Sequence, residues 1–235
     1  MKRKGNLYPA ILPCLLDVNV ASRKNKGTKQ GLLFMNSFMH KCKIRYSHFY
    51  ILKCDISKFF SSINHEILKK KLLKRIKDKD ALKIVFDIID SYSDGLGIGS
   101  MTSQVLAIFY LNDMDHFIKE NLKIQYYVRY QDDFLLFHPS KDYLKYCLNE
   151  ITKFLNSEKL VLNNKTRIYS SNDNFVFLGK NCFGNPSKYR SVKRRLKNKF
   201  KLYNQKIISL RSLVSTIICY KSHYPNMFKD DKNLF

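Results

Sequence analysis

Acidic residues are scarce in this chain of 235 residues, which has 19 Asp and Glu against 43 Lys and Arg and a formal net charge of +24. Long apolar runs are also absent. The longest, from Val105 to Leu111, falls far short of the roughly 20 residues that a membrane-spanning helix needs. No signal-peptide core follows the basic amino end. We therefore expect no membrane partner, and a polyanion is the first partner to consider.

Closely paired cysteines are missing as well. The six cysteines are scattered, with no Cys-x-x-Cys pair, which favours reduced core residues in an intracellular, cytoplasmic protein. The composition is 45% apolar and 14% aromatic, which excludes a disordered basic tail. The chain is therefore expected to bury a substantial core.

The positive charge is concentrated at the two ends of the chain. Residues 1–45 hold 10 basic residues and 1 acidic residue, and residues 187–235 hold 13 basic and 2 acidic residues. The charges of the centre, residues 46–186, are nearly balanced, with 20 basic and 16 acidic residues. Basic flanks around an acid-bearing centre indicate an enzyme that grips a polyanion and carries out metal chemistry between the grips.

Hydrophobic patterning predicts an α+β fold with a ferredoxin-like sheet. The order of strand, helices, strand, turn, strand, helix, strand is the split β-α-β-β-α-β arrangement. Because helices connect the first two strands, these should run in the same direction and end at one rim. The strands are expected at 49–55, 126–130, 134–137, 160–162, 166–169 and 175–178, and the helices at 67–76, 82–89, 103–118, 144–155 and beyond 187.

Three carboxylates are expected to meet at that rim. Asp55 ends the first strand, and Asp132 and Asp133 follow the second. Clustered carboxylates repel unless a cation neutralises them, and oxygen ligands with open coordination positions suit Mg²⁺. Two such ions can drive the in-line displacement of pyrophosphate. Taken alone, Asp132-Asp133 would fit an ordinary hairpin tip, but the upstream partner acid favours a metal site.

The motifs around these acids resemble those of reverse transcriptases. Tyr130-Gln131-Asp132-Asp133 resembles their Tyr-x-Asp-Asp box, and Asp55 to Phe60 resembles their Asp-x-x-x-Phe-Phe box. In Gly95 to Gln104, Ile98 stands where Gln is usual and Gln104 where Pro is usual. This form is similar to the enzymes of diversity-generating retroelements. The segments 22–28, 162–169 and 175–179 also resemble that group.

The resemblance implies a right-hand polymerase. Residues 1–45 would form partial fingers, 46–186 the palm with a finger insertion at about 65–100, and 187–235 a helical thumb. The first finger strands of the family are expected to be shortened here, since few residues precede Arg23.

The resemblance also implies RNA-directed DNA synthesis, a nucleotidyl transfer that uses two Mg²⁺ ions, with Mn²⁺ as an alternative. Asp55 and Asp132 would bind both ions together with the backbone carbonyl of Ile56, and Asp133 would be a secondary ligand. Lys165 would protonate the leaving pyrophosphate, although a solvated loop lysine is the alternative.

Other residues take nucleotide-binding roles by the same resemblance. Phe60 would be the steric gate that excludes a ribose 2′-hydroxyl, unless it is a core residue, the role expected of Phe59. Ile98, Gly99 and Gln104 would contact the incoming nucleotide. Ile98 implies misincorporation at template adenines. Nucleic-acid contacts are expected from Arg23, Lys24, Lys26, Phe177, Leu178, Gly179, Lys193, Arg194, Arg195 and Lys197.

The implied partners are a template RNA, its RNA–DNA hybrid, dNTPs and a small basic accessory protein, in a bacterial, phage or plasmid-encoded system. Two alternatives stay open at this point. One is a reverse transcriptase of the retron, group II intron or phage-defence type. The other is a non-catalytic RNA-binding protein, which shortened fingers favour and the intact acids oppose.

Overall fold

The computed structural model describes residues 8–183 and 190–223 of the chain. The chain divides into two compact units, one ending at Ser171 and the other beginning at Asn172. The expected boundary between palm and thumb, at 186–187, lies outside the described residues. The division into fingers, palm and thumb therefore stays a prediction.

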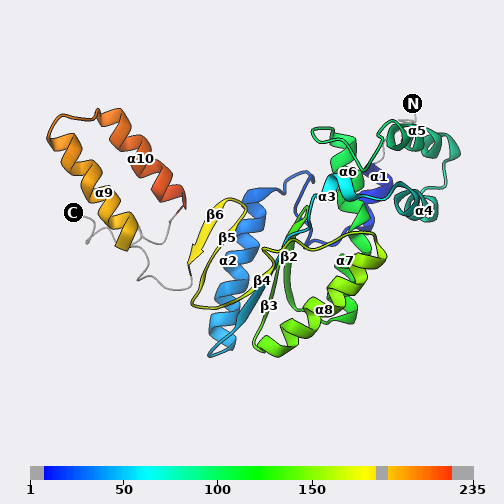
Figure 1. Cartoon of the computed structure of the whole chain (residues 1–235), viewed down its shortest axis with the longest axis horizontal. Coiled ribbons are helices and arrows are strands. Elements are labelled where there is room, and N and C mark those ends of the chain that lie inside the picture. The colour runs from blue at the N-terminus through cyan, green and yellow to red at the C-terminus, as the bar shows by residue number, and fades with distance from the viewer. Residues whose placement is uncertain (1–7, 184–189, 224–235) are drawn as a thin grey trace. The chain divides into compact units, whose positions relative to one another are not determined.

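A four-stranded antiparallel sheet forms the centre of the first unit (Figure 1). Its spatial order is β2-β3-β1-β4, with β1 at Tyr50–Cys54, β2 at Tyr126–Tyr130, β3 at Asp133–His138 and β4 at Arg167–Ser170. Because β1 and β2 are both antiparallel to β3, they run in the same direction, as the connecting helices predict. The expected ferredoxin-like α+β fold is confirmed.

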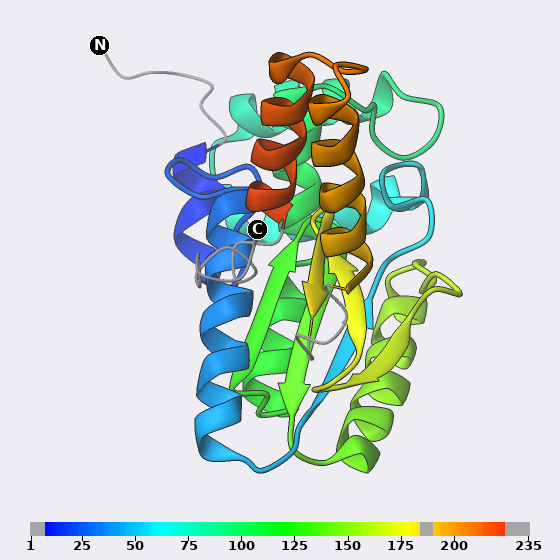
Figure 2. The ribbon, with the colours of Figure 1, turned by 90° about the vertical axis from the view of Figure 1, so that its left-hand side faces the viewer.

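Helices cover both faces of this sheet (Figure 2). The apolar stripe of α8 (Lys141–Ser157) packs against β1, β3 and β4, where Leu136 joins the core. On the other face, α2 (Thr28–Arg45) contacts β2 and β3, and the ring of Phe38 lies 6.0 Å from that of Phe137. Adjacent strand residues point to opposite faces of the sheet, so Leu136 lies on the face covered by α8 and Phe137 on the face covered by α2.

The helices between β1 and β2 begin at polar caps or close turns. Asn64 caps α4 (His65–Arg75) by accepting a hydrogen bond from the Ile67 amide, and Asp78 caps α5 (Lys79–Asp90) in the same way. The remaining elements of this unit are α1 (Tyr8–Ile11), η1 (Leu12–Cys14), α3 (Phe59–Ser62), α6 (Met101–Tyr110), α7 (Asn112–His116) and the π-helical turn η2 (Phe117–Asn121).

Some local expectations needed correction. The helix expected over 103–118 begins at Met101 and is interrupted at Leu111, where the backbone leaves helical geometry. Residues 160–162 do not form a strand; Leu162 makes only an isolated bridge to Ile56. The sequence patterns also missed α2, whose buried positions are small or flexible residues: Gly31, Met35, Met39 and Cys42.

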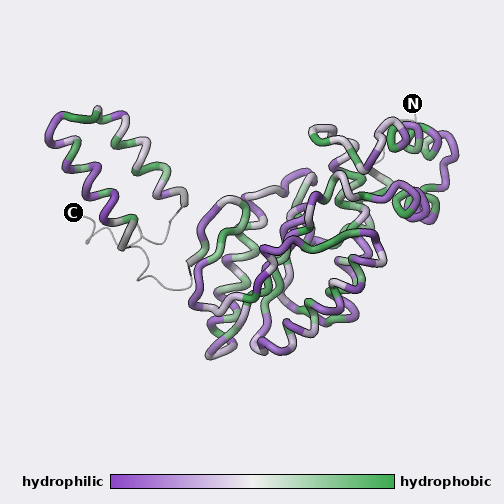
Figure 3. Tube along the Cα trace, in the orientation of Figure 1, coloured by the Kyte–Doolittle hydropathy of each residue, from purple (hydrophilic) through white to green (hydrophobic). Residues whose placement is uncertain are grey.

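The second unit contains a hairpin and two helices. The hairpin pairs β5 (Asn174–Phe177) with β6 (Lys180–Phe183), and α9 (Arg190–Asn204) contacts α10 (Leu210–His223). Hydrophobic positions recur along both helices among hydrophilic ones (Figure 3), and Val192, Leu196 and Leu213 are buried. Within the described ranges, no helix is both long and apolar enough to span a membrane.

Candidate active site

The three predicted acids lie at one end of the sheet, where β1 and β2 both terminate. Asp55 directly follows β1, whose last residue, Cys54, pairs with Phe134. Asp132 occupies the two-residue turn between β2 and β3, and Asp133 is the first residue of β3, opposite Tyr130. The topology thus gathers carboxylates that are far apart in sequence.

The three acids influence one another electrostatically. Burial raises the pKa of Asp132, and the charges of Asp55 and Asp133 raise it further, whereas the ammonium of Lys53 opposes them. Lys53 Nζ lies 2.7 Å from Asp133 Oδ1, and both side chains are largely buried. No motif in the sequence points to Lys53. Its signal was a charged residue inside an otherwise apolar strand.

The backbone of Asp55 is fixed by a second segment. The Asn163 amide donates to the Asp55 carbonyl at 2.7 Å, and the Ser57 amide donates to the Val161 carbonyl at 2.9 Å. Ile56, between them, is buried. This pairing places the turn that carries the exposed Lys165 beside the Asp55 segment in space.

Phe59 and Phe60 have different environments in α3. Phe59 is buried, as expected for a core residue, and Phe60 is only partly buried. The carbonyl of Phe60 accepts a hydrogen bond from the Leu96 amide at 2.8 Å. His65 Nε2 lies 2.5 Å from the Gly95 carbonyl, and this second contact also holds the loop that begins at Gly95.

In the glycine-rich loop that starts at Gly95, Leu96 is buried, whereas Ile98 and Gly99 are exposed. Ile98 is 89% exposed, and Gly99 adopts φ +96° with nothing within 4 Å of the position that an added Cβ would take. Gln104 is held inside: its Oε1 accepts from Ser22 Oγ at 3.0 Å, and the same hydroxyl accepts from Gln131 Nε2 at 3.0 Å. Ser22 therefore links the start of α6 to the turn that holds Asp132.

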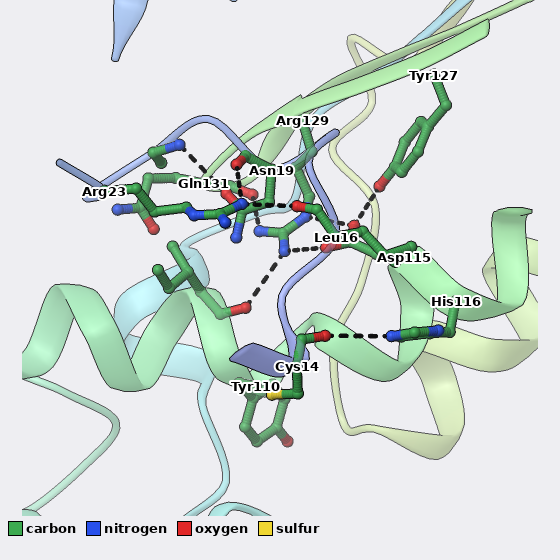
Figure 4. Close-up of polar contacts among 12 residues, drawn as sticks. Cys14, Leu16, Asn19, Arg23, Tyr110, Asp115, His116, Tyr127, Arg129 and Gln131 are labelled. Atoms are coloured by element: carbon green, nitrogen blue, oxygen red, sulfur yellow. Dashed lines mark hydrogen bonds and ion pairs between the residues drawn. The ribbon is translucent and has the colours of Figure 1, made fainter. Parts of the chain in front are cut away.

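The basic residues of the amino-terminal segment differ in availability. Arg23 Nη1 donates to the carbonyls of Leu16 and Asn19 (Figure 4), so its guanidinium holds this loop together. Lys26 pairs with Asp17 at 2.7 Å. Lys24 is exposed.

The expected nucleic-acid contacts of the second unit lie on a hairpin and a helix. Phe177 is buried at the end of β5, and Leu178 and Gly179 form the turn to β6. The helix α9 carries the exposed Arg194, Arg195 and Lys197, and Lys193 belongs to the same helix.

The oxygen-only donor set and the mutual repulsion at Asp132 fit a divalent cation. The gathering is nevertheless incomplete. In the part of the chain that the structure describes, no three His, Cys, Asp or Glu side chains group closely enough to surround an ion. Asp133 is engaged with Lys53 instead. A cation bound by Asp133 would share this carboxylate with the Lys53 ammonium, which contacts its Oδ1.

The antiparallel sheet carries acids where β1 and β2 end, and comparison with known proteins specifies the class of the chain. A family model described as reverse transcriptase (RNA-dependent DNA polymerase) matches residues 7–182. The chain belongs to the reverse transcriptase family.

Individual relatives are distant. The chain is 26% identical to protein YkfC of Escherichia coli K12, over 61% of this chain and 49% of that protein. It is similar in fold to Candida albicans telomerase solved with a TWJ fragment of telomeric RNA, with a TM-score of 0.57 and 15% identity. The match covers 97% of this chain and 48% of the telomerase chain. It is also similar in fold to apo Candida tropicalis telomerase truncated from its C-terminal domain, with a TM-score of 0.53 and 18% identity. That match covers 66% of this chain and 37% of the telomerase chain. The chain thus spans about half the length of these relatives or less.

Proposed function

We propose that this chain is an RNA-directed DNA polymerase that copies a template RNA into cDNA. One observation carries the proposal: Asp55 and the Asp132–Asp133 pair lie at the same end of the sheet, within the residues that match the reverse transcriptase family. The shared fold of telomerases supports the same architecture but not a particular substrate.

In this proposal, Asp55 and Asp132 bind the cations, joined by the carbonyl of Ile56, and Asp133 contributes as a weaker ligand. Mg²⁺ or Mn²⁺ ions held there would activate the primer 3′-hydroxyl and neutralise the departing pyrophosphate. Lys53 holds Asp133 until the site is loaded. Lys165, exposed beside the Asp55 segment, donates the proton that the pyrophosphate takes.

The nucleotide and the nucleic acids are assigned to different sets of residues. The partly buried ring of Phe60 excludes a 2′-hydroxyl, and Ile98, Gly99 and Gln104 line the approach of the dNTP. The exposed cations of α9 and Lys24 bind the phosphates of template RNA and of the RNA–DNA hybrid, which the net charge of +24 supports. The basic ends, the turn at Phe177–Gly179 and a small basic accessory protein complete the proposed assembly.

Primer extension tests the function directly. Purified protein, a DNA primer annealed to a defined RNA template and the four dNTPs are expected to give template-length cDNA with Mg²⁺ or Mn²⁺ and none after chelation by EDTA. Binding of the primer–template is measured in parallel by fluorescence anisotropy. Tight binding without extension under either metal would contradict the proposal and favour a non-catalytic RNA-binding protein.

A finer proposal concerns fidelity. Ile98 is 89% exposed on the glycine-rich loop and offers the templating pair only an apolar surface, without the hydrogen bonds that a Gln could make. We expect misincorporation to be concentrated at template adenines, as in diversity-generating retroelements, and Ile98→Gln to reduce it by about tenfold. Sequencing of cDNA made from one RNA template measures this.

Met101→Gln is the matched control for the fidelity measurement, because Met101 is also an exposed apolar residue, three positions further along. It should leave the adenine bias unchanged. Equal error rates at all four template bases, unaffected by Ile98→Gln, would exclude the retroelement assignment while leaving the polymerase assignment intact.

A further inference from the structure

A fully buried ion pair contacts the two-residue turn that carries Asp132. Arg129 and Asp115 are both 0% exposed. Arg129 Nη2 lies 2.5 Å from Asp115 Oδ2, and Nε donates to Oδ1 at 2.7 Å (Figure 4). Tyr127 Oη also donates to Asp115 Oδ1, at 2.6 Å. Burial and then the Asp115 charge raise the pKa of Tyr127, which keeps this hydroxyl protonated.

Stability alone is a weak reason for such a pair. Removing two charges from water costs several kcal/mol for each ion, and apolar replacements of buried pairs are often neutral or stabilising. The guanidinium, however, has donors beyond those that satisfy the carboxylate. Its Nη1 donates to the carbonyl of Gln131 at 3.0 Å, and its Nη2 donates to the carbonyl of Ile108 at 3.2 Å.

The Gln131 carbonyl is a sensitive point for the site. Gln131 adopts φ +54°, a left-handed conformation that is unfavourable for a side chain other than glycine and must be held by its surroundings. Its carbonyl is part of the peptide unit that continues into Asp132. Its side chain is fixed separately by Ser22. Both anchors together orient the two-residue turn.

The backbone of Arg129 extends this support to the amino-terminal segment. Its amide donates to the Val18 carbonyl at 2.9 Å, and its carbonyl accepts from the Val20 amide at 3.0 Å. Arg129 thus joins α6, α7, the amino-terminal segment and the turn. A lysine could neutralise Asp115, but one ammonium lacks the planar fork that reaches both the carboxylate and the Gln131 carbonyl.

We infer that Arg129 is a positioning residue for Asp132, and that Asp115 fixes the guanidinium so that it sets the conformation of the Gln131–Asp132 turn. This inference rests on the proposed function. It goes beyond that function by assigning a role to a fully buried charged pair.

The test replaces the whole pair, so that no buried charge is left alone. Arg129→Met with Asp115→Leu should fold cooperatively but lose kcat for dNTP incorporation by about 10- to 100-fold, with a smaller change in KM. Mn²⁺ affinity, measured by calorimetry without substrate, should weaken by a similar factor. Arg129→Lys should show the same losses with a melting temperature close to that of the wild type.

The matched control is Lys71→Met with Glu158→Leu. This ion pair, at 2.9 Å, is also largely buried and contacts α6 through the Tyr110 carbonyl, but it does not touch the turn. It should keep wild-type kcat and Mn²⁺ affinity. If the Arg129 variants fold and keep both values, or if Arg129→Lys does so alone, the inference is overturned. A wild type without turnover would refute the proposed function, and the Mn²⁺ affinities would still decide the role of Arg129.

Discussion

Replacing Asp132 with alanine is expected to abolish DNA synthesis by this chain, with a loss in kcat of about a thousandfold or more, while primer–template binding is retained. Asp132 lies where β1 and β2 end, and its charge is coupled to those of Asp55 and Asp133. Removing a group that acts directly on the charge of the transition state has effects of this size. Primer extension and fluorescence anisotropy measure the two properties separately.

Binding should persist because the attraction for phosphate comes from the excess of basic residues, which the loss of one carboxylate does not reduce. Asp142→Ala is the matched control, since this exposed acid on α8 pairs with Lys145 at 2.8 Å, a surface contact of small energetic value. Extension at the wild-type rate by the Asp132 variant would refute its role as a metal ligand.

Gly95→Ala is expected to cause the second large effect, a loss of about 2–4 kcal/mol in the free energy of unfolding of the first unit. Gly95 adopts φ +57°, which costs a residue with a side chain about 1 kcal/mol. A Cβ there would also overlap the Phe60 carbonyl and come within 2.5 Å of Ser61 Cα. Relieving such an overlap costs about 1–3 kcal/mol more. Denaturant titration measures the sum.

Gly99→Ala separates the two contributions. Gly99 also has a positive φ, +96°, but an added Cβ meets nothing within 4 Å, so this variant should show the conformational cost alone. Moving the loop away from Phe60 should also raise KM for dNTPs in Gly95→Ala. Equal midpoints of unfolding for the two variants would show that the packing of Gly95 against α3 contributes nothing.

Much of the sheet could be predicted from local patterns. Short apolar runs that end in turn residues specified β1, β2 and β3, and the helices between the first two strands fixed their common direction. The expected position of Asp55 near Asp132 followed from that direction. Prediction failed where the pattern is weak, as in α2, which buries Gly31 and three flexible or small side chains. It also failed at β6, where Lys180–Phe183 pairs with β5 without an alternating apolar pattern.

The sequence by itself thus determined β1, β2 and β3, the acids at the ends of β1 and β2 and the basic ends, and its motifs indicated one family. Only the tertiary structure decided which charges pair. Lys53 pairs with Asp133 across 80 positions, and Arg129 reaches Asp115 on α7 as well as the Gln131 carbonyl. The periodicity of apolar residues indicates which of them face the core, because each apolar side chain gains free energy from burial independently of its neighbours. A hydrogen-bond partner depends on how separate elements pack, which no local pattern encodes.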